Sequence, residues 1–260
     1  MEEMFGLRNR SAVVTGGLGQ IGMAISLALE EAGASVVIID CDEEAWNAEL
    51  AGLSADGRKF SFFNADVSNA ELVPEVVQSA DDRTDGFDIW VNCAYPRTED
   101  WGNRPENDRP ISWRRNVDMQ MTATCLYADR AAQHMAAREG GSVVNIASIY
   151  GVVSPNFLVY EGTDMISPAA YSAIKGGIIS HTKFIAMYYG RSGVRANAVW
   201  PGGVAANQPS SFVERYNDQT ALGRMAEAEE LGPAVVFLAS EAASYITGAT
   251  LMVDGGWTAN

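Results

Sequence analysis

Two residues four positions apart could share a proton-transfer task. Tyr171 and Lys175 stand in a Tyr-x-x-x-Lys pattern within Ala169 to Tyr189, a stretch with helical spacing. Positions i and i+4 share one face of a helix, so the Lys175 ammonium is expected beside the Tyr171 phenol. A phenol titrates near pH ~10 in water, and a fixed cation nearby favours the phenolate. The pair therefore predicts a general acid/base that works near neutral pH.

A serine upstream could complete this centre. Ser148 follows the apolar run Ser142 to Ala147, which has the composition of a buried strand. Its hydroxyl could donate a hydrogen bond to a reacting oxygen, and that bond would strengthen as charge develops there. Serines end strands commonly, so only the combination with the Tyr-Lys pair favours a catalytic role for Ser148.

A glycine-rich turn near the N-terminus predicts a dinucleotide site. Gly16, Gly19 and Gly22 lie between a predicted strand, Ala12 to Thr15, and a predicted helix, Gln20 to Glu31. Glycines at these points let the backbone approach a pyrophosphate at the helix N-terminus. A purely structural tight turn is the alternative, and the strand-turn-helix context disfavours it.

Two aspartates after the next strands would complete the cofactor site. Asp40 ends the predicted second strand, the expected position for an acid that binds a ribose diol. A carboxylate repels a 2′-phosphate, and no neighbouring arginine offsets it, so Asp40 predicts NAD rather than NADP. Asp66 follows the third strand and could bind the adenine, or it could cap a helix together with Ser68.

Short β-branched runs alternate with longer helical patterns along the chain. The predicted strands are Ala12 to Thr15, Ser35 to Asp40, Phe60 to Asn64, Ile89 to Asn92, Ser142 to Ala147, Val194 to Trp200 and Thr250 to Val253. The predicted helices are Gln20 to Glu31, Trp113 to Arg138, Ala169 to Tyr189 and Ala226 to Ser240. Near-continuous apolar strands indicate a parallel sheet covered on both faces. We therefore expect an α/β fold with a doubly wound, seven-stranded parallel sheet (Rossmann fold), in one domain over residues 1–260.

Composition narrows the class of protein. The chain has 260 residues and a net charge of -15, which disfavours nucleic acid as a partner. Its three cysteines are scattered and it has two histidines, so neither a disulfide framework nor a metal site is expected. No stretch reaches membrane-spanning length and the N-terminus does not read as a secretory signal, so a cytoplasmic protein without a membrane partner is expected.

With these motifs in this order, the chain resembles the short-chain dehydrogenase/reductase family over nearly its whole length, in the single-domain branch. The matching pieces are the glycine turn, Asp66-Val67, Asn92-Cys-Ala94, Asn116-Val117, Ser148, the Tyr-x-x-x-Lys pattern, Pro201-Gly202 and Val253-Asp-Gly-Gly256. The resemblance implies an oxidoreductase in which Tyr171 is the acid/base, Ser148 polarises the reacting group and Lys175 binds the nicotinamide ribose. It also implies that Asn116 positions a relay water.

The same resemblance implies the remaining cofactor contacts and an assembly. The NAD-binding residues would be Gly16, Gly19, Gln20, Ile21, Gly22, Asp40, Asp66, Val67, Asn92, Ala94, Tyr171, Lys175, Pro201, Gly202 and Val204. The apolar and small-residue faces of the helices around Asn116 to Ala137 and Ala169 to Tyr189 favour a homo-oligomer, and the family implies a tetramer or dimer.

The chain departs from the family pattern where a substrate would bind. Tyr95 replaces a usual glycine, and 23 residues separate Ser148 from Tyr171, more than is typical. Tyr95 and Arg97 follow the fourth strand and are predicted to bind the substrate, although Arg97 could instead pair with Glu99 or Asp100 at the surface. The motifs Tyr95-Pro-Arg97, Tyr160 to Asp164 and Asn207 to Pro209 more narrowly resemble bacterial flagellin-modification oxidoreductases, which act in making nonulosonic-acid-type sugars.

The expected activity is NAD-dependent interconversion of a secondary alcohol and a ketone on a small, polar, sugar-derived substrate. A reductase of acyl or steroid-type ketones is the alternative within the family, and it would need a mostly apolar lid. The segment after the sixth strand is instead rich in polar residues, namely Asn207, Gln208, Glu214, Arg215 and Asn217. A non-catalytic NAD-binding regulator is the alternative from another class, and the four retained catalytic residues disfavour it.

Overall fold

Seven parallel strands form one sheet in the order β3-β2-β1-β4-β5-β6-β7. The computed structural model describes residues 2–50, 52 and 57–259. The strands are β1 (Ser11–Thr15), β2 (Ser35–Asp40), β3 (Phe60–Asn64), β4 (Ile89–Asn92), β5 (Gly141–Ile146), β6 (Val194–Pro201) and β7 (Thr250–Val253). The predicted seven-stranded, doubly wound sheet is confirmed, with strand ends shifted by a residue at most.

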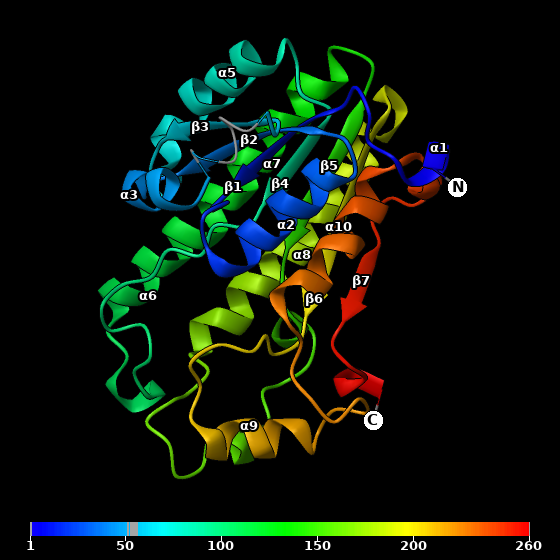
Figure 1. Cartoon of the computed structure of the whole chain (residues 1–260). Helices are drawn as coiled ribbons and strands as arrows, with labels where there is room; N and C mark the ends of the chain where they lie inside the picture. The colour runs from blue at the N-terminus through cyan, green and yellow to red at the C-terminus, as the bar shows by residue number, and fades with distance from the viewer. Residues whose placement is uncertain (1, 51, 53–56, 260) are drawn as a thin grey trace.

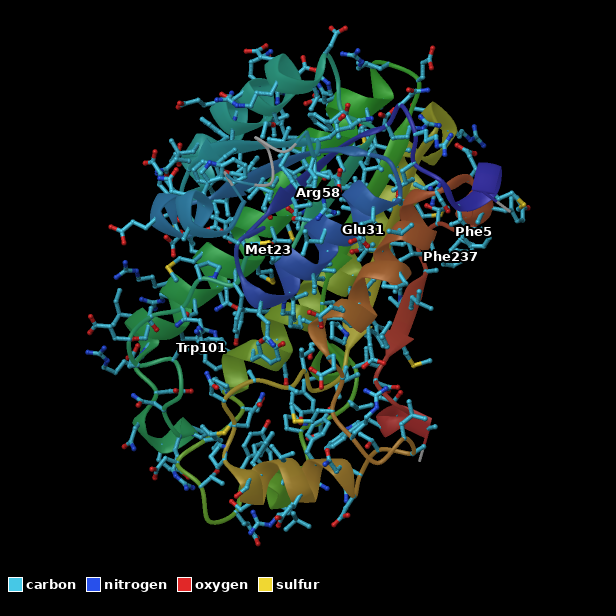
Figure 2. The ribbon with its side chains drawn as sticks, viewed as in Figure 1. Phe5, Met23, Glu31, Arg58, Trp101 and Phe237 are labelled. Carbon is cyan, nitrogen blue, oxygen red and sulfur yellow. The ribbon has the colours of Figure 1, made fainter. Side chains whose placement is uncertain are left out.

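Helices cover both faces of this sheet (Figure 1). They are α1 (Glu2–Phe5), α2 (Gln20–Glu31), α3 (Glu43–Ala45), α5 (Val73–Thr84), α6 (Pro110–Asn116), α7 (Ala123–Ala136), α8 (Ala169–Tyr189), α9 (Ser210–Asn217) and α10 (Gly232–Ala239). One apolar cluster joins α5, α7 and α8 to one face of the sheet, and a second joins α2 and α10 to the other. Near the N-terminus, Phe5 lies against Phe237 of α10 (Figure 2).

The long helix predicted from Trp113 to Arg138 is divided. It begins at Pro110, widens into a π-helical turn over Val117–Thr122 and continues as α7. Such wide turns arise where an extra residue is accommodated in a helix, often beside a functional site. The widening follows directly after Asn116.

Besides the short helices α1 and α3, two helices of eight or more residues, α5 and α9, were not expected from the sequence. In α5 the buried residues Val73, Val76, Val77 and Ala80 have amphipathic spacing, which would have predicted the helix. A proline in its first turn is compatible with a helix start. Helix α9 has eight residues, too few for its period to stand out from the surrounding loop.

Helix α9 lies beyond the carboxyl ends of the strands, apart from both helical layers (Figure 1). It is held by a small apolar cluster of its own, in which Phe212 and Tyr216 are buried. The Tyr216 ring stacks on Trp257 near the C-terminus, with ring centroids 4.3 Å apart. The segments around α9 therefore form a packed wall above the end of the sheet where α/β folds bind ligands.

The structure describes the cysteines, the potential metal ligands and the apolar helices that the composition drew attention to. All three cysteines are free thiols. Among the described residues, no group of three or more His, Cys, Asp or Glu side chains could hold a metal ion. None of the helices in the described part of the chain is both long enough and apolar enough to cross a membrane.

Candidate functional site

A cavity of about 850 Å³ opens at the carboxyl ends of the strands. Its walls combine the glycine turn after β1, the segments after β2 to β6 and the first turns of α8. Of the residues predicted to bind cofactor or substrate or to act in catalysis, those in the wall are Gly16, Gly19, Gln20, Ile21, Gly22, Asp40, Asp66, Val67, Ala94, Tyr95, Arg97, Ser148, Tyr171, Lys175, Pro201, Gly202 and Val204. The fold thus brings nearly all of the predicted residues to one place.

The glycine turn is shaped by close backbone contacts. Gly16 has φ +66°, and a Cβ there would lie 2.5 Å from the Cα of Ala94. A Cβ at Gly22 would overlap the carbonyl oxygen of Gly16. Gly19 differs, because a Cβ there would meet only the Gly16 oxygen at 3.5 Å, an ordinary contact.

The N-terminus of α2 opens into the cavity. Gly19 is the N-cap residue, and no side chain caps the helix. Gln20, Ile21 and Gly22, the first three helical residues, line the cavity wall. Unpaired N–H groups and the helix dipole favour an anion at such a position, so this end fits the pyrophosphate of a dinucleotide.

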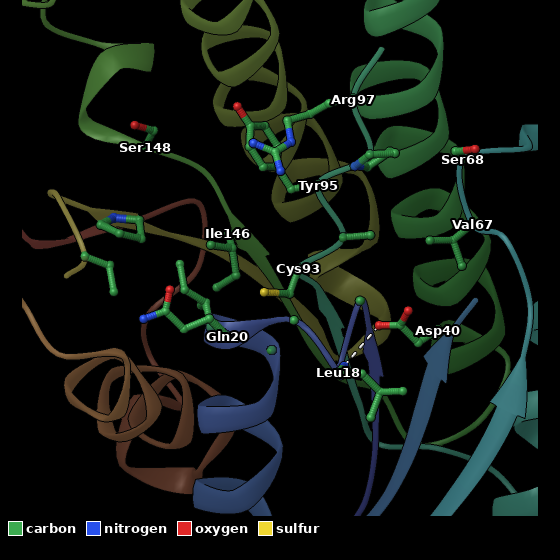
Figure 3. A pocket seen from close by; sticks show the side chains of 18 of the residues that line it. Leu18, Gln20, Asp40, Val67, Ser68, Cys93, Tyr95, Arg97, Ile146 and Ser148 are labelled. Carbon is green, nitrogen blue, oxygen red and sulfur yellow. Dashed lines mark hydrogen bonds between the residues drawn. The ribbon is translucent and has the colours of Figure 1, made fainter. Parts of the chain in front are cut away.

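Asp40 is held in place at the end of β2. One carboxylate oxygen accepts a hydrogen bond from the Leu18 N–H at 3.0 Å, as Figure 3 shows, and the other accepts from the Cys41 N–H at 2.8 Å. The carboxylate is thus anchored to the glycine turn on one side and faces the cavity on the other. No arginine or lysine lies in this part of the wall, which fits a ribose diol better than a 2′-phosphate.

Asp66 forms a tight turn at the cavity wall. Its carboxylate accepts a hydrogen bond from the Ser68 N–H at 2.9 Å. The helix that follows is capped by Asn69, so Asp66 is not the helix cap that the sequence offered as one alternative. Asp66 lines the cavity next to Val67, where the other alternative, a contact to an adenine, stays a prediction.

Ser148, Tyr171 and Lys175 meet at the other end of the cavity. All three line its wall, and Ser148 and Lys175 are buried. Lys175 lies one helical turn after Tyr171 on α8, with its Nζ atom 5.7 Å from the Tyr171 ring centroid. Nζ donates a hydrogen bond to the Ile146 carbonyl at 2.9 Å, so β5 and α8 are joined beneath the phenol.

Burial is the largest influence on the pKa values of Tyr171 and Lys175. Loss of water raises the pKa of the Tyr171 phenol, although a hydrogen bond from Ser148 lowers it in part. Burial also lowers the pKa of Lys175 to about 8, which leaves most of the amine charged at neutral pH. The sequence predicted that Lys175 would draw the phenol toward the phenolate. In this structure the pKa of the phenol is raised instead, because desolvation of the phenolate is the larger effect.

Two residues predicted for the site lie outside the cavity wall. Asn92 is buried behind it, where it donates to Asn145 at 2.8 Å and accepts from the Trp90 indole at 2.9 Å. Asn116 donates to the Thr98 hydroxyl at 2.7 Å and to the Ser112 carbonyl at 2.9 Å. Asn116 also accepts from the Thr98 N–H at 3.2 Å, so its side chain holds the loop that follows β4.

That loop presents an aromatic wall to the catalytic end. The Tyr95 ring meets Tyr171 edge to face, with centroids 5.6 Å apart. Behind it, the Trp101 indole donates to the Tyr95 hydroxyl at 2.7 Å. Arg97 lies over the Tyr95 ring at 5.2 Å from its centroid, and Figure 3 shows the pair well away from Asp40.

Sequence reasoning missed several residues of the wall. Cys93 lies at its centre, and burial raises the pKa of this thiol to about 12, so it remains a neutral thiol. Met165 also lines the cavity. Nothing in their local sequence marks these two residues, because their place depends on how distant segments pack. Gln20, which was predicted to bind the cofactor, also donates to the Ala205 carbonyl at 2.6 Å and thereby ties the glycine turn to the segment after β6.

The polar residues of the segment after β6 divide between cavity and surface. Gln208 lines the cavity, whereas Asn207, Glu214, Arg215 and Asn217 are not part of its wall. Arg215 instead donates to the Glu161 carbonyl. The polar composition of this segment therefore reflects its outer surface more than its inner one.

Comparisons with known proteins agree with this geometry. A sequence model of the family described as Enoyl-(Acyl carrier protein) reductase matches residues 18–258. A cis-4-hydroxycyclohexanecarboxylate dehydrogenase of Sinomonas cyclohexanicum is 34% identical over 258 residues, which are 96% of this chain and 97% of that protein. A post-translational flagellin modification protein A of Campylobacter coli is 27% identical over 253 residues, 96% of this chain and 99% of that protein.

Solved structures share the fold over the full length. The crystal structure of gox2181 has a TM-score of 0.89 at 31% identity and covers 100% of both chains. A gluconate 5-dehydrogenase from Burkholderia cenocepacia in complex with NADP and tartrate has a TM-score of 0.88 at 28% identity, covering 100% of this chain and 99% of that one. A short chain dehydrogenase from Leptospira borgpetersenii with bound NAD+ has a TM-score of 0.85 at 29% identity, covering 97% and 94%. These two complexes differ in their nucleotide, so the comparisons support NAD or NADP as the cofactor class.

Proposed function

The chain belongs to the short-chain dehydrogenase/reductase family, and we propose that it is an NAD-dependent oxidoreductase that interconverts a secondary alcohol and a ketone on a polar, sugar-derived substrate. The observation that carries this proposal is the meeting of Ser148, Tyr171 and Lys175 in the same cavity as the glycine turn and Asp40. A non-catalytic regulator would not need these side chains together. Their arrangement supports catalysis instead.

The chain's own residues supply binding and proton transfer. The bound nicotinamide would donate or accept the hydride. The Tyr171 phenol, whose pKa is raised by burial, gives its proton to the reacting oxygen during reduction, and in its phenolate form it takes the hydroxyl proton during oxidation. Ser148 hydrogen-bonds the reacting oxygen, and the Lys175 charge beneath the phenol lowers the cost of forming phenolate.

The direct test is a spectrophotometric assay of the purified protein. With NAD and a panel of polyols, aminosugars and hydroxy acids, we expect reduced nicotinamide to accumulate with at least one substrate. The same panel should include hydroxysteroids and hydroxyacyl thioesters, since these represent the alternative within the family. Turnover of only those apolar or acyl substrates would contradict the polar assignment.

Support for a polar substrate comes from the inner wall. Arg97 and Ser148 line the cavity together with Tyr95 and Tyr171. The flagellin modification protein named above is consistent with a sugar-derived substrate, as the loop motifs of the sequence also suggested. Helix α9 supplies no apolar lid of the kind that a steroid would need, because Phe212 and Tyr216 are buried in their own cluster.

The proposed preference for NAD rests on Asp40, so replacing Asp40 should change the nucleotide preference. We expect Asp40→Ala combined with Cys41→Arg to raise the NADP-to-NAD ratio of kcat/KM by about 100-fold or more, since a charge-assisted contact is lost and a phosphate partner is gained. Steady-state kinetics with both nucleotides measures this ratio. Asp42→Ser, at a neighbouring acid of the same wall, is the control and should change the ratio little. A wild-type enzyme that used both nucleotides equally would refute the role of Asp40.

We also propose that the protein is a homo-oligomer, a tetramer or dimer, through the outer surface of α7 and α8. The residues on which the sequence argument rested, among them Ala128 and Ile185, are buried within the subunit core. A different set is exposed on these helices: Leu126, Phe184, Met187 and Tyr188, of which Met187 is 84% and Tyr188 68% exposed. Exposed apolar patches of this kind are typical of subunit interfaces.

A charge placed in this patch should dissociate the oligomer. We expect light scattering at micromolar concentration to give a multimeric mass for the wild type and a monomeric mass for Phe184→Glu with Tyr188→Glu, because burying a carboxylate in an apolar contact is unfavourable. Lys59→Glu, on an exposed residue near β3, should keep the wild-type mass. A monomeric wild type would exclude the proposed interface.

A further inference from the structure

The charges of the cavity wall are divided between its two ends. The acidic residues of the wall are Asp40, Asp42 and Asp66, all on the side of the glycine turn. The catalytic end instead holds the cations Arg97 and Lys175 and no carboxylate. Such an end attracts a negatively charged group and disfavours a positively charged one.

Arg97 is available to a ligand. Within the described residues it makes no ion pair or hydrogen bond, and its contact is the face of the Tyr95 ring. The surface pairing considered from the sequence is taken by another arginine, since Arg109 binds Asp100 at 2.7 Å. Ser112 donates to the same carboxylate at 2.5 Å. The Oδ2 atom of Asp100 is thus engaged by Arg109 and Ser112, and neither Asp100 nor Glu99 forms an ion pair with Arg97 among the described residues.

Arg97 and Tyr171 both contact the Tyr95 ring. The Arg97 guanidinium carbon is 5.2 Å from the Tyr95 ring centroid, and that centroid is 5.6 Å from the Tyr171 centroid. All three residues line the same cavity, so Arg97 belongs to the part of the wall that surrounds the phenol.

The loop that carries Arg97 is fixed at several points. Asn116 holds Thr98 through bonds of 2.7 and 3.2 Å, and Trp101 holds the Tyr95 hydroxyl at 2.7 Å. A guanidinium on an ordered loop loses less conformational freedom when it binds, which favours a specific contact over a transient one.

From these observations we infer that the substrate carries a carboxylate, which Arg97 binds while the carbinol carbon lies at Tyr171 and Ser148. This inference rests on the proposed function and names the substrate class as a compact hydroxy acid. The planar guanidinium matches a carboxylate through two parallel hydrogen bonds. A phosphate ester would bring nearly two charges to this single free cation, so the carboxylate is the better match.

The test compares acids with their uncharged amides. Reduced nicotinamide would be followed with 3-hydroxybutyrate, 4-hydroxycyclohexanecarboxylate and gluconate, each beside its amide, and with glycerol 3-phosphate beside glycerol. We expect the preferred acid to exceed its amide in kcat/KM by about 10- to 100-fold, the worth of a charged hydrogen-bonded contact. Arg97→Gln should abolish this preference, because kcat/KM for the acid should fall to about that for the amide. Arg104→Gln, an exposed arginine of the same loop outside the wall, should keep it.

A binding measurement separates this inference from the proposed function. Calorimetric titration of the enzyme–NAD complex with cyclohexanecarboxylate and cyclohexanecarboxamide needs no turnover, and we expect the acid alone to bind in a manner that depends on Arg97. The inference would be overturned if acids and amides gave equal kcat/KM and bound equally well, or if a preference for the acid persisted in Arg97→Gln. A preference for glycerol 3-phosphate over every carboxylate would also overturn it. Absence of turnover with every alcohol would instead count against the proposed function, and the titration would still decide the role of Arg97.

Discussion

Tyr171→Phe should lower kcat by a factor of about 100 or more while NAD affinity changes little. The substitution removes the phenolic oxygen and keeps the ring, whose edge-to-face contacts with Tyr95 and Trp101 hold the wall of the cavity. Lys175 keeps its hydrogen bond to Ile146 in this variant, so the floor of the site stays in place. Turnover on the best substrate and NAD binding by fluorescence titration measure the two quantities.

Tyr160→Phe is the matched control for this loss. The Tyr160 hydroxyl lies 3.4 Å from that of Tyr150, and the residue is outside the cavity wall. The Tyr160→Phe substitution also removes a phenolic oxygen, but from a neighbouring aromatic cluster, so we expect activity close to that of the wild type. Near-normal activity in Tyr171→Phe would exclude Tyr171 as the acid/base.

A pair of glycine substitutions should separate folding from cofactor binding. A Cβ at Gly22 would overlap the Gly16 carbonyl oxygen, which belongs to the backbone and cannot turn aside. Gly22→Ala should therefore lower the free energy of unfolding by about 1–3 kcal/mol or more. Thermal or denaturant unfolding of the protein without added nucleotide measures this loss.

Gly19→Ala should behave in the opposite way. Gly19 has φ -68° and ψ 161°, a conformation that alanine adopts freely, and a Cβ there meets only one atom at an ordinary distance. We expect stability close to that of the wild type but NAD affinity at least about tenfold weaker, a loss of about 1.4 kcal/mol, because the methyl group would enter the space for the pyrophosphate. If Gly19→Ala bound NAD as tightly as the wild type, the nucleotide would not approach the turn at this residue.

Local pattern accounts for most of what could be predicted. The near-continuous apolar runs predicted every strand of the sheet, since a buried parallel strand is apolar on both faces. The spacing of Tyr171 and Lys175 predicted a shared helical face, and both residues line one cavity. Asp40 and the glycine turn were also placed correctly, because strand ends of a doubly wound sheet meet at one edge.

Asn92, Asn116 and the segment after β6 show what local sequence pattern could not predict. The resemblance implied a cofactor contact for Asn92 and a relay water at Asn116, and these roles stay predictions; what the sequence did not show is that their side chains bond Asn145 and Thr98 outside the cavity wall. Composition likewise suggested a polar inner lid, whereas α9 turns its polar face outward. A residue type defines which bonds a side chain can make, and it does not define which partner the fold will bring to it.

The sequence by itself thus determined the sheet, the glycine turn and the shared helical face of Tyr171 and Lys175, because each depends on periodicity or on spacing within one segment. The tertiary structure alone decided that Arg109 pairs with Asp100 and that Arg97 lies over the Tyr95 ring, without an ion pair among the described residues. It also decided that burial raises the pKa of the Tyr171 phenol despite the nearby lysine. Both outcomes depend on the solvent and partners that surround a side chain, and these are set only when distant segments pack together.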